Sequence, residues 1–149
     1  MTATTPSPKS FPTASITRSA AAALIEASRA QAHKLGIEVT VAVTDAAGHL
    51  RAFERTDGAP FLTVNIAIDK AWTAAAFGLP THVWNKILTH DAQAAQLAHQ
   101  PRLVAVGGGY PIVENGTLIG ALGISGGTYL EDQQAAEGAL AAQGFDVPA

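Results

Sequence analysis

Three ionisable side chains, Lys70, Asp57 and Glu131, could transfer protons in this chain of 149 residues. Carboxylates act as acids or bases, and each of these could move a proton on a small substrate. Lys70 lies among alanines, where partial removal from water lowers the pKa of an amine unless a carboxylate pairs with it. These three are our candidate catalytic residues, for isomerase, tautomerase or lyase chemistry. The structural alternative is an ion pair from Lys70 to Asp57 or Glu131.

A glycine-rich segment could hold the ligand for such chemistry. Eight glycines fall within residues 107–127, more than strands need, because each leaves a gap in packing and costs conformational entropy. This density favours close approach by a ligand or by another chain. The helix predicted to begin after Gly127 would present free backbone N–H groups at its first turn, and these can bind an anionic oxygen. A nearby cation would add positive charge to the site. The candidate ligand-binding residues are Arg55, Gly108, Gly109, Tyr110, Gly126 and Gly127.

Tyr110 has two interpretations at this stage. It follows three glycines and precedes Pro111, so its ring could cover a planar ligand or pack between subunits. Glu131 also has a structural alternative, because Thr128 and Glu131 have the spacing of a capping box at the start of a helix.

The absence of cysteine limits the metal chemistry. Thiolate nucleophiles, iron–sulfur clusters and Cys-type zinc sites are excluded, and no His-x-x-x-His pair supports a zinc site.

Composition points to one globular domain. Hydrophobic residues make up 48% of the chain, enough for a core. A formal charge of −3, with nine scattered Lys and Arg residues, argues against a nucleic-acid partner. No apolar run approaches the ~20 residues that a membrane helix needs. We therefore expect a soluble, cytoplasmic protein with a flexible tail at residues 1–15 and a single domain at residues 16–149.

The hydrophobic periodicity predicts an α/β sandwich. Four helices and five strands are expected, and hairpin turns between strands favour a five-stranded, largely antiparallel sheet flanked by helices on one or both faces. In chain order the elements are a helix from Thr17 to Gly36, strands 39–43 and 50–53, helices 61–77 and 81–98, strands 103–106, 110–113 and 117–124, and a helix from Thr128 to about Gln143.

Several short sequence blocks occur together along the chain, namely Val41-Ala42-Val43-Thr44-Asp45 with Gly48-His49-Leu50, Arg55-Thr56-Asp57-Gly58-Ala59, Lys70-Ala71-Trp72-Thr73-Ala74, Phe77-Gly78-Leu79-Pro80-Thr81, Gly107-Gly108-Gly109-Tyr110-Pro111-Ile112 and Gly120-Ala121-Leu122-Gly123-Ile124-Ser125-Gly126-Gly127. In this order they resemble the GlcG/HbpS family, which also occurs as the C-terminal domain of PduO-type proteins. The resemblance covers residues 16–144 and implies an α/β sandwich that forms homo-oligomers, some of which bind haem. An enzymatic role on a small acid is also plausible for this family. Because some members bind haem, the resemblance makes haem a candidate ligand, and haem iron accepts imidazole or phenolate ligands. His33, near the end of the first predicted helix, is the candidate haem ligand, although a cation there also suits the helix dipole. The other candidates are His49, His82, His90, His99, Tyr110 and Tyr129.

Two functional hypotheses follow from the residues and the resemblance. The first is a haem-binding or haem-handling homo-oligomer of the GlcG/HbpS type. The second is a cofactor-free enzyme that acts on a small carboxylated intermediate, with Arg55 or Lys70 as the anchor. A non-catalytic accessory protein is a third interpretation. The expected partners are therefore haem or a small carboxylated molecule, and further copies of the chain.

Overall fold

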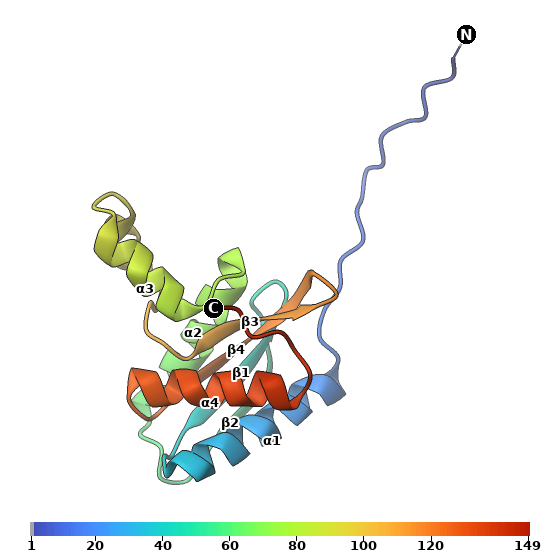
Figure 1. Ribbon diagram of the computed structural model, residues 1–149. Helices are drawn as coiled ribbons and strands as arrows, with labels where there is room; N and C mark the ends of the chain where they lie inside the picture. The colour runs from blue at the N-terminus through green and yellow to red at the C-terminus, as the bar shows by residue number, and fades with distance from the viewer. Residues whose placement is uncertain (1) are drawn as a thin grey trace.

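The computed structural model describes residues 2–149. Residues 2–15 form no helix or strand, and most of this segment extends away from the rest of the molecule (Figure 1). At its end, the Ser15 hydroxyl donates a hydrogen bond to the Ile119 carbonyl. The elements that follow are α1 (Arg18–Leu35), β1 (Thr40–Asp45), β2 (Leu50–Arg55), α2 (Leu62–Phe77), α3 (Thr81–His90), the 3-10 helix η1 (Ala94–His99), β3 (Gly109–Glu114), β4 (Thr117–Ser125) and α4 (Tyr129–Ala142).

The sheet has four strands in the order β2-β1-β4-β3, and every neighbouring pair is antiparallel. Helices α1 and α4 lie side by side on one face, and α2 covers the other (Figure 1). Helix α3 and η1 project from this body. The prediction of an α/β fold with helices around an antiparallel sheet is confirmed, with helices on both faces.

The expected helix boundaries follow from local capping. Thr17 accepts a hydrogen bond from the Ala20 N–H, and Gly36 ends α1 with a φ of 68°. A left-handed residue at this position favours glycine, which has no Cβ to clash. Thr128 and Glu131 form the predicted capping box at the start of α4. Such caps satisfy backbone groups that have no partner within the helix.

The prediction of a fifth strand at residues 103–106 is wrong. This segment runs as a loop, because side chains of α2 and α3 bind its backbone in place of a neighbouring strand. Thr73 accepts a hydrogen bond from the Val104 N–H, and Asn85 donates to the Ala105 carbonyl. Thr81 donates to the Val106 carbonyl. The apolar residues of the segment resembled a strand, but tertiary contacts determine its backbone.

The helix predicted for residues 81–98 is shorter in the structure. Helix α3 ends at His90, and Asp91 begins a new turn. The Asp91 carboxylate accepts hydrogen bonds from the backbone N–H groups of Gln93 and Ala94. Asp favours such local bonds over helix continuation, so the chain turns and forms η1 instead.

Candidate functional site

Lys70 forms a buried ion pair with Asp132. Its Nζ donates to Asp132 Oδ2 at 3.0 Å and to the Ile124 carbonyl at 2.9 Å, and the exposed fractions of the two residues are 1% and 2%. The other carboxylate oxygen of Asp132 accepts a hydrogen bond from the Gly127 N–H at 2.9 Å. The predicted ion pair of Lys70 therefore exists, but its partner is neither Asp57 nor Glu131.

Burial dominates the electrostatics of this pair. It lowers the pKa of Lys70 and raises that of Asp132, and the attraction between the two groups opposes both shifts. Removal from water is expensive for each charge, and only the partner and the surrounding hydrogen bonds compensate for it. The geometry therefore assigns the pair a structural role, in which it joins α2 on one face of the sheet to α4 on the other.

Gly108 and Gly109, which the sequence predicts near a ligand, lie against the Lys70–Asp132 pair and the backbone around it. A Cβ at Gly108 would lie 3.0 Å from Lys70 Nζ and 2.6 Å from the Ile124 carbonyl oxygen. A Cβ at Gly109 would lie 2.6 Å from the Lys70 carbonyl oxygen. Both positions must lack a side chain so that Lys70 can reach past the strands. Close packing within the chain thus accounts for these two glycines.

Gly126, Gly127 and Glu131 have similar structural explanations. A Cβ at Gly126 would collide with the Glu38 carbonyl oxygen, and one at Gly127 would lie 2.6 Å from Glu131 Oε2. The Glu131 carboxylate accepts a hydrogen bond from the Thr128 N–H at 2.8 Å. It therefore acts as the acid of the capping box, as its alternative interpretation held.

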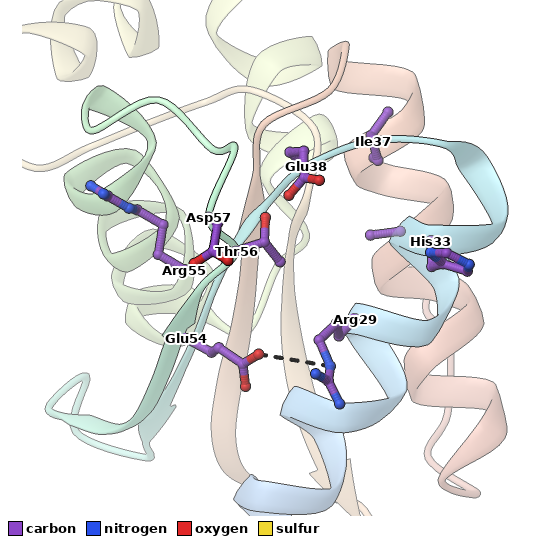
Figure 2. Close-up of a pocket in the computed structure, with 9 residues that line it drawn as sticks. Arg29, His33, Ile37, Glu38, Glu54, Arg55, Thr56 and Asp57 are labelled. Carbon is purple, nitrogen blue, oxygen red and sulfur yellow. Dashed lines mark ion pairs between the residues drawn. The ribbon is translucent and has the colours of Figure 1, made fainter.

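Three other predicted site residues, His33, Arg55 and Asp57, line a pocket of about 350 Å³ between α1 and the end of β2. Figure 2 shows Arg29 and Glu54 facing each other across this pocket, with 3.7 Å between Nε and Oε1, whereas Arg55 points away from them. Most side chains around it are charged. The structure thus separates His33, Arg55 and Asp57 from the Lys70 pair, and the pocket suits a polar ligand better than an apolar one.

Tyr110 lies in the core. Its ring is fully buried, and its hydroxyl donates to Glu137 Oε1 at 2.5 Å. Burial and this carboxylate raise the pKa of Tyr110 far above its ordinary value. The ring centroid lies 5.5 Å from that of His82. Tyr110 therefore cannot cover a ligand directly. Instead, its ring packs against the His82 ring from the interior of the protein.

A second pocket, of about 540 Å³, lies between α3 and the first turns of α4. This volume is typical of sites for small molecules and cofactors. The exposed apolar side chains of Val106, Tyr129 and Leu130 border it. The remaining lining residues are His82, Asn85, Lys86, Gly107 and Gln133.

His82 is the most unusual polar group in this second pocket. Its Nδ1 atom is buried and has no hydrogen-bond partner among residues 2–149. Desolvation is the main cause that lowers the pKa of His82, and the nearby Lys86 adds to the effect, whereas Glu137 opposes it. The ring is therefore neutral at physiological pH, and no partner fixes its tautomer. A neutral imidazole in an apolar pocket wall can serve as a metal ligand.

His82 is one of the haem-ligand candidates in the sequence, where His33 is the candidate selected. The useful signal was the spacing of His82 and Lys86, four residues apart on one helix and therefore on one face. Its polar residues favour a solvent-exposed face, because no sequence feature indicates that α4 and the Gly107 loop lie opposite it. The sequence does not identify Asp132 as the partner of Lys70, because the capping-box spacing singles out the adjacent Glu131.

No group of three or more His, Cys, Asp or Glu residues within 2–149 could hold a metal ion. None of the helices in this part of the chain is both long and apolar enough to cross a bilayer.

Comparisons with known proteins identify relatives over nearly the whole fold. Residues 16–141 match the family described as haem degrading protein HbpS-like. An uncharacterised 15.0 kDa protein from the dhaT-dhaS intergenic region of Citrobacter freundii is 37% identical over 134 residues, which cover 89% of this chain and 94% of that protein.

Two solved structures are also similar. The crystal structure of a PduOC:haem complex is 32% identical, with a TM-score of 0.82, and the match covers 89% of this chain and 97% of that one. The crystal structure of HbpS is 29% identical, with a TM-score of 0.85, over 95% of this chain and 99% of that one.

Proposed function

We propose that this chain, which belongs to the HbpS-like family, binds haem in the pocket between α3 and α4. Support from comparison is the PduOC:haem complex, a relative of the same fold. The observation that carries the proposal is the neutral, partly exposed His82 ring in the wall of an apolar pocket.

The side chains around this pocket fit the chemistry of haem. A porphyrin is flat and largely apolar, and Val106, Tyr129 and Leu130 offer exposed apolar contact area. Haem iron binds neutral imidazole readily. Burial of these three side chains against a ligand would stabilise the complex by about 25 cal/mol for each Å² of apolar surface removed from water. The charged pocket at His33 offers much less apolar surface of this kind.

Each residue would have a distinct role. His82 would hold the iron, and the buried Tyr110 ring would support the imidazole from the interior. Haem, when bound, would supply an iron centre for ligand binding or redox chemistry. We also propose that the chain forms homo-oligomers, because the large apolar side chains of Phe61, Leu62 and Phe77 are exposed in a single copy.

The cofactor-free enzyme remains the alternative. It requires Lys70 to contact a substrate, yet Lys70 and Asp132 are buried and line neither of the two pockets described above. The structural observations therefore favour the haem-binding proposal.

Replacement of His82 tests the proposal directly. We expect His82→Ala to weaken haem binding by about tenfold or more, since even groups behind a metal ligand contribute on this scale, and to shift the Soret band. The measurement is a haem titration followed by absorbance. His33→Ala is the matched control, because His33 lies in the other pocket. Unchanged binding by His82→Ala, or a loss seen only with His33→Ala, would contradict the assignment.

Acid should release haem at an unusually low pH. The pKa of His82 is lowered from its ordinary value of 6.5, because burial and Lys86 disfavour the imidazolium form. Protons compete with iron for the imidazole around and below its pKa in the unliganded protein, so the fall in affinity should be centred below pH 6.5. Haem titrations across the acidic range measure this. A fall in affinity centred above pH 6.5 would contradict the predicted shift.

A further inference from the structure

Lys86 is an unpaired positive charge at the pocket between α3 and α4. It lies one helical turn beyond His82 and lines the same pocket. Its amine makes no ion pair in the described part of the chain, where the ion pairs involve Arg29, His49, Lys70 and Arg102. No carboxylate side chain lines this pocket. The charge of Lys86 is thus available to a ligand.

The remaining walls restrict the kind of ligand that could use this charge. Val106, Tyr129 and Leu130 present apolar surface, and all three are exposed. Gln133 donates to the Glu137 carboxylate, and Asn85 donates to the Ala105 carbonyl, so both amide groups already have partners within the chain. A complementary ligand is therefore apolar over most of its surface and carries a negative charge at one edge.

We infer that Lys86 binds a carboxylate of the ligand and thereby makes the pocket selective for carboxylate-bearing tetrapyrroles, including those without iron. This inference rests on the proposed function, because it places Lys86 in the same pocket as His82. The two side chains recognise different parts of the ligand. His82 recognises the metal, whereas Lys86 recognises the acidic edge, so each anchor can be removed separately.

The experiment titrates three probes into the wild-type chain and into the variants Lys86→Met and His82→Ala. The probes are haemin, haemin dimethyl ester and metal-free protoporphyrin, followed by absorbance or by porphyrin fluorescence. Lys86→Met retains an unbranched side chain of similar length but removes the charge. Lys34→Met is the matched control, because Lys34 is an exposed lysine in the last turn of α1 and does not line this pocket.

Lys86→Met should weaken binding of haemin and of protoporphyrin about fivefold, the scale of a partly exposed ion pair. Its affinity for the dimethyl ester should equal that of the wild-type chain. His82→Ala should weaken haemin binding but leave protoporphyrin binding unchanged. Added salt should reduce the affinity of the wild-type chain for the acids more than for the ester.

Three results would overturn the inference. Lys86→Met could bind all three probes as the wild-type chain does, it could weaken the ester as much as the acids, or the wild-type chain could bind none of the probes. The first result, together with a loss of haemin binding in His82→Ala, would leave the proposed function intact. Conversely, Lys86-dependent binding of protoporphyrin without any effect of His82 on haemin would support the inference and contradict the proposed iron ligand.

Discussion

Lys70→Met should destabilise the folded chain by about 3–5 kcal/mol, because it leaves the Asp132 carboxylate buried without its cation. Asp132 would retain the hydrogen bond from the Gly127 N–H but lose the one from Lys70 Nζ at 3.0 Å. Met is close to Lys in length and is apolar, so little of the loss would come from packing. Urea unfolding measured by circular dichroism gives the free energy of unfolding for each variant.

The double variant Lys70→Met/Asp132→Leu separates charge from packing. Replacement of both partners of a buried pair by apolar groups of similar volume is often neutral, so the double variant should recover most of the stability lost by Lys70→Met. Lys34→Met, which alters an exposed lysine, serves as the control. A Lys70→Met protein of unchanged stability would show that the pair has no structural role. If it also lost turnover of a small acid, the enzymatic alternative would regain support.

Gly123→Ala should cost at least about 3 kcal/mol and could prevent folding. A Cβ at this position would collide with the Ala67 carbonyl oxygen and would lie 2.7 Å from the Ala71 nitrogen. Both atoms belong to the backbone of α2, which cannot move aside without loss of its contacts with β1 and β4. Because this backbone cannot shift, the loss of stability should reach or exceed the upper end of the range usually seen when methyl groups are added to a core. Thermal unfolding and urea unfolding both measure the effect.

Gly138→Ala is the matched control for this prediction. Gly138 lies in α4, and its added Cβ would meet only the end of the Gln31 side chain, which can rotate away. Ala also favours a helix over Gly by up to about 1 kcal/mol. The control should therefore be neutral or stabilising. Equal losses in the two variants would show that close approach of α2 to β4 does not explain Gly123.

Local patterns predicted most of the fold, because short-range chemistry determines those parts. Alternating apolar residues identified β1, and the Thr128 and Glu131 pair marked the start of α4. Local patterns did not predict the structure of residues 103–106. Its backbone hydrogen bonds go to Thr73, Thr81 and Asn85, which are distant in sequence. No local pattern encodes such contacts.

The candidate site was less predictable than the fold for a related reason. The alanine-rich surroundings of Lys70 indicated burial correctly, but whether Asp132 or the adjacent Glu131 faces Lys70 depends on the orientation of the first turn of α4. The spacing of His82 and Lys86 could not by itself reveal the pocket, because that pocket combines α3, the Gly107 loop and α4. A site assembled from three separated segments becomes visible only once the tertiary arrangement is known.

The strand order has a consequence for how the chain acquires its structure. The central strand β1 pairs with β2 across a short turn, but its other edge pairs with β4, with Thr40 opposite Ser125. Nearly the whole middle of the chain must therefore be synthesised before the sheet can close, and such non-local pairing slows folding. During synthesis the β1–β2 hairpin emerges with an open edge and an apolar face, which makes this stage the one most exposed to aggregation and to capture by chaperones.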